Sequence, residues 1–127
     1  MSWQGYVDEQ LIGTGLLENA AILSVADGSV WGVKPSDFIK SGEGANIVEL
    51  YKSPSNAFSK GIVIGGVKYM GIKADERSLY GKKGATGVAC AKTNQCIIIG
   101  YYNEKQQPGN AALCVEKLAD YLIDNGY

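Results

Sequence analysis

The 127-residue sequence predicts an α+β domain with a central antiparallel β-sheet between two layers of helices. β-prone runs separated by short turns follow one another from Gly61 to Asn103, which favours antiparallel neighbours. Helical patterns lie at both ends of the chain and are expected to pack side by side on one face. Two short helical patterns between them are expected on the other face. The length favours a single domain spanning residues 1–127.

The N-terminal segment predicts a helix followed by a hairpin. Residues 3–13 place Trp3, Tyr6, Val7 and Leu11 on one helical face, with Ser2 as the N-cap and glycines ending the helix. Two β-prone runs, 20–26 and 29–33, then flank Asp27-Gly28. This pattern predicts a hairpin with a type I′ turn.

The middle of the chain predicts short helices and then strands. A helix is expected from Pro35 to about Lys40, and another from Glu43 to Lys52, before Ser53-Pro54-Ser55. Strands are expected over 62–64, 67–74, 78–80, 84–92 and 95–102. The turns between them are expected at 65–66, 75–76, 81–83 and 93–94.

The C-terminal segment gives the clearest helical pattern. Pro108 suits the first position of a helix, where its missing N–H is not needed. A core stripe follows at spacings of four, three and four, formed by Ala111, Val115, Leu118 and Leu122. The helix is expected to run to about Asp124, with Gly126 stopping it.

Composition excludes several classes of function. The sequence contains no histidine, so nucleophile–histidine pairs and histidine-containing metal sites are impossible, and we expect a protein that is not an enzyme and needs no cofactor. A net charge of −1 argues against a nucleic-acid partner. We see no signal peptide or apolar span, and three cysteines form no disulfide pattern, so a cytoplasmic monomer is expected.

Two of the cysteines, Cys90 and Cys96, flank the expected turn at Thr93-Asn94. If Lys92 pairs with Gln95, these two thiols point to opposite faces of the sheet and cannot form a disulfide. All three cysteines are expected to be small core residues.

Aromatic residues gather near both ends of the chain, at positions 3, 6, 31, 121 and 127. If the terminal helices are neighbours, these five side chains converge on one strip. Such a strip suits a polyproline II segment, whose rings pack on aromatic faces and whose carbonyls accept hydrogen bonds from Trp N–H and Tyr O–H groups. The alternative is that Trp3 and Trp31 only pack the helices onto the sheet.

These residues also carry a family resemblance. Ser2-Trp3-Gln4-Gly5-Tyr6-Val7-Asp8 resembles the N-terminal signature of profilins, and the likeness continues over 20–22, 28–31, 80–87, 102–105, 107–109 and 115–122. It implies a sheet between two pairs of helices. It also implies binding of monomeric actin with effects on nucleotide exchange and polymerisation, binding of proline-rich partners such as formins, and binding of phosphoinositides, in a cytoplasmic, cytoskeleton-associated protein.

The resemblance also assigns residues. It implies a groove for proline-rich peptides formed by Trp3, Tyr6, Trp31, Tyr121, Leu122 and Tyr127. The implied actin surface comprises Lys73, Lys82, Thr86, Gly109, Leu113 and Lys117. Lys82 and Lys83 are the expected phosphoinositide contacts, and the alternative for this pair is a turn with solvated lysines.

Other functions predict different features. A sensory or scaffold module of the PAS or roadblock type has a similar plan of sheet and helices, but it gives no reason for aromatic residues at both ends. A small enzyme is disfavoured by the missing histidine. The adjacent carboxylates Asp75 and Glu76 are interpreted as a turn, because neighbouring strand residues point to opposite sides.

Overall fold

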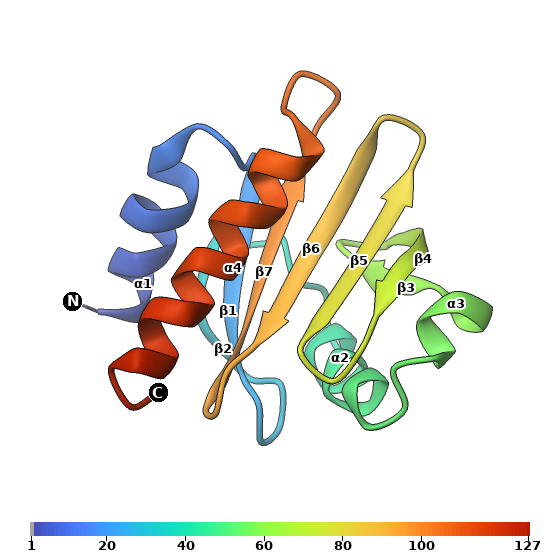
Figure 1. Ribbon diagram of the computed structural model, residues 1–127, viewed down its shortest axis with the longest axis horizontal. Coiled ribbons are helices and arrows are strands. Elements are labelled where there is room, and N and C mark those ends of the chain that lie inside the picture. Colours follow the sequence, from blue (N-terminus) through green and yellow to red (C-terminus); the bar gives the residue numbers. More distant parts are fainter. Residues whose placement is uncertain (1) are drawn as a thin grey trace.

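The computed structural model describes residues 2–127 and has the predicted sheet between two helical layers (Figure 1). Within this range, seven strands form one antiparallel sheet in the order β2-β1-β7-β6-β5-β4-β3. The strands are β1 (Asn19–Ser24), β2 (Val30–Lys34), β3 (Ile62–Ile64), β4 (Val67–Ala74), β5 (Ser78–Lys83), β6 (Thr86–Lys92) and β7 (Cys96–Tyr102).

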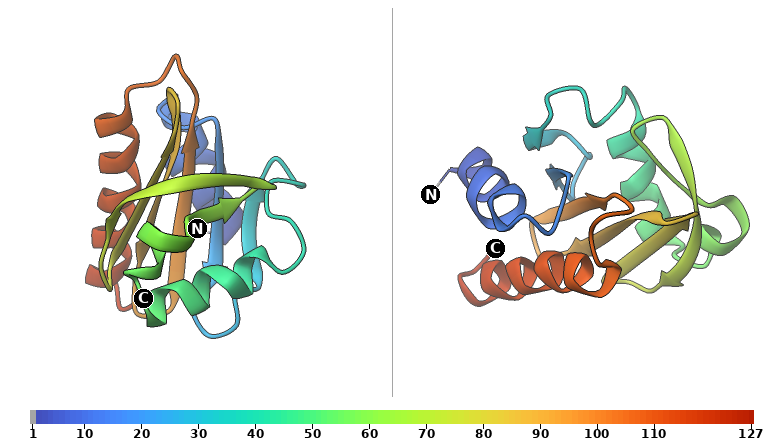
Figure 2. Two further views of the ribbon diagram at one scale, coloured as in Figure 1. Left: turned by 90° about the vertical axis from the view of Figure 1, so that its right-hand side faces the viewer. Right: turned by 90° about the horizontal axis from the view of Figure 1, so that it is seen from above.

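The helices at the two chain ends form one layer of the molecule. The layer contains α1 (Trp3–Gly5), the π-helical η1 (Tyr6–Leu11), the 3-10 helix η2 (Ile12–Thr14) and α4 (Pro108–Asp124). The other layer contains α2 (Glu43–Lys52) and α3 (Asn56–Lys60). Ser2 caps the first turn by accepting a hydrogen bond from the Gly5 N–H, as predicted. The first three helical segments run continuously beside α4, and the views in Figure 2 place both on the same side of the sheet.

Strand alternation divides the core into two parts. Ile98 of β7 and Ala89 of β6 face the terminal helices, where they meet Val7 and the predicted stripe of α4. Ile97 and Ile99 face the opposite way, toward α2 and α3. Strands β1, β6 and β7 are thus covered on both faces, and the terminal helices are held next to each other by a shared buried core.

Two predictions in the first half of the chain are wrong. Asp27 lacks the positive φ that a type I′ turn needs, and a longer loop joins β1 to β2, closed by Ser24 N–H donating to the Ser29 carbonyl. Residues 35–40 form a turn, not a helix. The predicted helix Glu43–Lys52 is present as α2. Its partner in the same layer is α3, which was not predicted; it follows Pro54 and packs against β4 at Gly71.

Two turn assignments in the sheet also differ from expectation. The predicted turn at 81–83 lies inside β5, because the chain reverses at Gly84, where φ is +61°. At the β6–β7 turn, Lys92 pairs with Ile97 and not with Gln95. This shift of two residues preserves alternation, so Cys90 and Cys96 still face opposite cores, and all three thiols are free.

Candidate functional site

Five aromatic side chains form a continuous strip where the N-terminal helical segment begins and α4 ends. We name Trp3, Tyr6, Trp31, Tyr121 and Tyr127 the aromatic strip. Trp3 is its centre, with ring centroids 5.0 Å from Trp31, 5.4 Å from Tyr127 and 5.8 Å from Tyr6. Tyr6 continues the strip to Tyr121 at 6.3 Å. The predicted convergence of the two chain ends is therefore present.

Contacts with β2 fix the position of Trp3. The Gln4 side chain donates to the Val33 carbonyl (2.9 Å) and accepts from the Val33 N–H (3.0 Å), so it pairs with the outer edge of β2 as another strand would. Gly32 allows close approach, since a Cβ there would lie 3.0 Å from the Trp3 carbonyl oxygen. Together they set the Trp3 ring against Trp31.

The β6–β7 turn fixes the position of Tyr127. The Gln95 N–H donates to the main-chain oxygen of Tyr127 (2.7 Å), and the Thr93 hydroxyl donates to the same atom (3.1 Å). The Tyr127 N–H donates to the Leu122 carbonyl (2.8 Å). The sequence pattern marks Thr93 only as a turn residue, and neither this role nor that of Gln4 was predicted from it.

Exposure separates the surface of the strip from its support. Tyr121 is 52% exposed and Tyr127 39%, so burial does not account for either ring. Leu122, in contrast, is fully buried. It lies beneath the rings and has no surface to offer a ligand, which corrects its predicted place among the peptide contacts.

The pKa of Tyr6 is raised, mainly by burial and to a smaller extent by the nearby Tyr121. Its hydroxyl therefore stays a hydrogen-bond donor well into the alkaline range.

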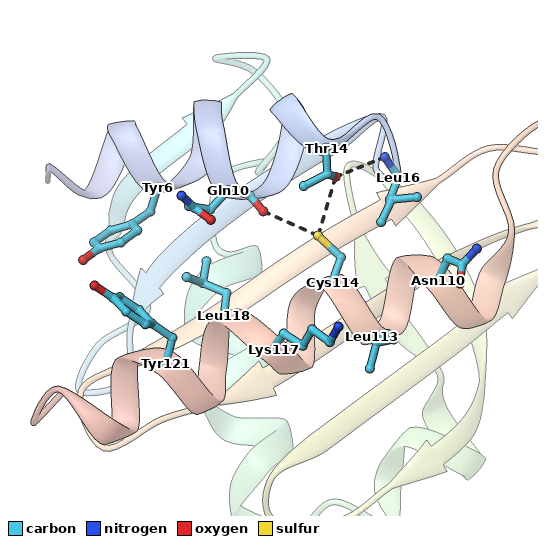
Figure 3. Close-up of a pocket in the computed structure, with 10 residues that line it drawn as sticks. All are labelled: Tyr6, Gln10, Thr14, Leu16, Asn110, Leu113, Cys114, Lys117, Leu118 and Tyr121. Atoms are coloured by element: carbon cyan, nitrogen blue, oxygen red, sulfur yellow. Dashed lines mark hydrogen bonds between the residues drawn. The ribbon is translucent and has the colours of Figure 1, made fainter.

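A concave pocket begins where the strip ends (Figure 3). It has a volume of about 680 Å³ and lies between the N-terminal helical segment and α4. Tyr6 and Tyr121 form one end, and Leu16 and Asn110 lie toward the other. Cys114 lies in the floor, with its sulfur 3.5 Å from the Gln10 carbonyl oxygen and 3.7 Å from the Thr14 hydroxyl.

A polar network ties the other side of α4 to β5. Glu116 accepts hydrogen bonds from the hydroxyls of Ser78 (2.6 Å) and Tyr80, and it pairs with Arg77 at 3.1 Å. Arg77 also pairs with Asp120 at 2.8 Å. Burial and the bond to Glu116 raise the pKa of Tyr80, which keeps its hydroxyl protonated. The network therefore joins the helix of the aromatic strip to the half of the sheet beyond α4.

The sheet beyond α4 carries part of the predicted actin surface. Tyr80 and Lys82 point to the same side of β5, the side on which Tyr80 meets α4. In the neighbouring strand β4, Met70 pairs in register with Lys82 and Lys73 pairs with Tyr80, so both of these exposed side chains lie on that side too. We name Met70, Lys73 and Lys82 the open sheet face. Met70 is 65% exposed, and the sequence analysis missed it because it lies inside an ordinary strand pattern.

The remaining predicted residues are distributed differently. Thr86 pairs with Lys83, one position from Lys82, so alternation places both on the opposite side from Lys82. Lys82 and Lys83 therefore do not form one compact basic pair. On α4, Leu113 and Lys117 line the pocket, and the exposed Gly109 lies in the first turn of the helix. Exposed Ile72 and Phe58 are further apolar side chains that the sequence analysis did not assign.

Residues 2–127 contain no group of three potential ligands that could hold a metal ion. Nor does any helix in this range combine the length and apolar character needed to cross a bilayer.

Comparisons with known proteins agree on one family. The family model described as Profilin matches residues 1–127. Profilin-P of Physarum polycephalum is 66% identical over 127 residues, with both chains covered completely. The crystal structure of Acanthamoeba castellanii profilin II superposes with a TM-score of 0.94 at 47% identity, covering 99% of this chain and all of the other. Schizosaccharomyces pombe profilin gives a TM-score of 0.95 at 41% identity, with the same coverage.

One more distant structure contains a bound peptide. Mouse profilin IIa, in complex with a double repeat from the FH1 domain of mDia1, is 21% identical, with a TM-score of 0.79 and full coverage of both chains. At that identity the likeness concerns the fold alone. The family match over the whole length and the relatives above 40% identity show that this chain belongs to the profilin family.

Proposed function

We propose that this chain, as a single domain, binds monomeric actin and regulates its polymerisation, and that its aromatic strip binds proline-rich segments such as those of formins. The observation that carries the proposal is the strip itself, which is assembled from both chain ends and held by bonds from β2 and the β6–β7 turn. Partly exposed rings with polar tips suit the flat faces and free carbonyls of a polyproline II helix. The FH1 peptide bound by the mouse profilin is consistent with this partner class.

The actin surface is proposed to centre on the open sheet face. Met70 offers exposed apolar area beside Lys73 and Lys82, and a mixed surface of this kind suits a protein partner. Lys82, with Lys83 on the other side of the strand, is the proposed contact for phosphoinositides. Lipid binding through Lys82 would then compete with actin. In this role the protein acts in the cytoplasm with the actin cytoskeleton, as a binding protein without catalysis.

The first experiment is a titration of the protein with polyproline, followed by tryptophan fluorescence. Because Trp3 and Trp31 lie in the strip, a saturable change is expected, while a Gly-Ser peptide of equal length gives none. Assembly of labelled actin monomers is then measured with and without the protein. Unchanged fluorescence at millimolar proline would contradict the peptide site, and unchanged actin assembly would contradict the actin role.

A further inference from the structure

We infer that the pocket between the N-terminal helical segment and α4 is a second part of the peptide site, which takes an apolar side chain with a neighbouring carboxylate from the residues that flank a proline run. This inference rests on the proposed function of the aromatic strip. It assigns to the pocket a ligand chemistry different from that of the strip.

The pocket continues directly from the strip. Tyr6 and Tyr121 belong to both, because their rings end the strip and also form one wall of the pocket. Figure 3 shows the pocket running onward from these two tyrosines along the groove between the helices. A chain leaving the strip past Tyr6 and Tyr121 therefore enters the pocket without having to turn away from the protein.

The shapes of the two parts differ. Successive rings from Tyr127 through Trp3 and Tyr6 to Tyr121 are 5.4 to 6.3 Å apart. Each step corresponds to about two residues of polyproline II, which rises ~3.1 Å per residue. The pocket is instead concave, at about 680 Å³, with Leu16, Leu113 and Leu118 among its lining residues. A branched aliphatic side chain fills such a hollow better than a flat pyrrolidine ring.

The charge of the pocket lining determines which ligand residue is favoured next to the apolar side chain. Lys117 is the only charged side chain among the residues that line the pocket, and it forms no ion pair within residues 2–127. The other polar groups, on Gln10, Thr14 and Asn110, are neutral. A carboxylate next to the apolar side chain would gain the attraction of Lys117 without facing a fixed negative charge in the lining.

The pocket is already formed without a ligand. The Cys114 sulfur contacts both the Gln10 carbonyl and the Thr14 hydroxyl, and the Thr14 hydroxyl in turn donates to the Leu11 carbonyl at 2.7 Å. These contacts hold the floor and one wall in place. A ligand side chain therefore does not have to reorganise the protein to enter, which preserves its binding energy.

The test compares five synthetic peptides by calorimetry and by tryptophan fluorescence. They are octaproline, octaproline extended by Leu-Asp at its N-terminal or its C-terminal end, and octaproline extended by Leu-Lys at each of the same two ends. On the native chain, Leu-Asp at one of the two ends is expected to increase affinity about fivefold to tenfold over octaproline. In the Lys117→Glu variant this gain should disappear, and Leu-Lys should now bind more tightly than Leu-Asp. The exposed Lys105→Glu is the matched control and should leave the order of the peptides unchanged.

The outcomes separate the inference from the proposed function. If octaproline binds but Leu-Asp adds nothing at either end, the inference is overturned and the strip stands. If Leu-Asp adds affinity that Lys117→Glu does not reverse, the side chains bind elsewhere and the inference is likewise overturned. If octaproline itself does not bind, the proposed peptide site fails and the inference fails with it. Binding of octaproline by both variants with equal affinity confirms that they are folded.

Discussion

The aromatic strip and the open sheet face differ in how their side chains are held. The strip is fixed at two points, where the Gln4 side chain of α1 bonds the main chain of β2 and where Thr93 of the β6–β7 turn bonds the main chain of Tyr127, and its rings touch one another. The open sheet face consists of side chains that project from strands, of which Lys73 makes one ion pair of 3.6 Å with Asp75. A rigid arrangement suits a repetitive, rigid ligand, and independent side chains suit a broad protein surface.

This difference makes the two surfaces separable by mutation. Removing one ring from the strip alters its neighbours, because each ring packs on the next. Removing one side chain from the open sheet face leaves the others in place, since they are set by the sheet and not by one another.

Leu122→Ala should reduce the free energy of unfolding by about 3 kcal/mol, because it leaves a cavity beneath the strip. Denaturant unfolding measures this loss. The volume-conserving Leu122→Met should keep both stability and polyproline affinity nearly unchanged. A large loss of affinity in Leu122→Met, with stability retained, would instead make Leu122 a direct contact.

Trp3→Ala should weaken polyproline binding about thirtyfold, or ~2 kcal/mol, since Trp3 contacts three of the other four rings. Calorimetry measures the peptide affinity, and labelled-actin assembly measures the other surface. Actin affinity should stay within about twofold. A parallel loss of both activities would show that the two surfaces are not independent.

Met70→Asp should weaken actin binding about tenfold, because it places a charge at the most exposed apolar side chain of the open sheet face. The matched control is Val30→Asp, an exposed apolar side chain of β2 at the opposite edge of the sheet. Sedimentation or fluorescence with actin monomers distinguishes the two. Equal losses in both variants would place the actin contacts elsewhere.

Thr93→Val should weaken polyproline binding about threefold, since it removes one of the two hydrogen bonds to the main-chain oxygen of Tyr127. Thr93→Ser keeps the hydroxyl and should restore the affinity. Actin binding should be unchanged in both. Retention of full affinity in Thr93→Val would show that the bond from the Gln95 N–H is enough to hold the main-chain oxygen of Tyr127.

Polyproline affinity should show no pH dependence between about pH 6 and 9. The chain has no histidine, and burial raises the pKa of Tyr6 above its usual value near 10. A raised pKa keeps the hydroxyl protonated below that value, so its donor is lost only as the pH rises through it. Calorimetry across this range checks the prediction, and a transition near neutral pH would contradict it.

The sequence predicts elements whose signals are local. The stripe of α4, the cap at Ser2 and the strands β3 and β4 follow from spacing and capping within a few residues, and all are confirmed. The convergence of Trp3 with Tyr127 could also be predicted from the sequence, because it required only that two amphipathic helices share one face of the sheet.

What the sequence did not predict depends on distant contacts or on competing local signals. Gln4 and Thr93 act through main-chain atoms 29 and 34 positions away, and no spacing rule connects such pairs.

Gly81 belongs to a Gly-Lys-Lys-Gly run typical of a turn. Yet it lies inside a strand, where a Cβ would lie 2.7 Å from that of Tyr69, while Gly84 makes the turn. Met70 was missed because alternation alone does not say where α4 stops covering the sheet.

The bonds to the main-chain oxygen of Tyr127 have a thermodynamic consequence. The first and last residues of a domain fray more readily than its interior unless they are tied down, and this strip is built from both. Molecules in which Tyr127 or Trp3 has detached are folded but do not bind, so the apparent dissociation constant is the intrinsic one divided by the competent fraction. Peptide affinity should therefore fall on warming well before the sheet unfolds, and bound peptide should slow amide exchange at both chain ends together.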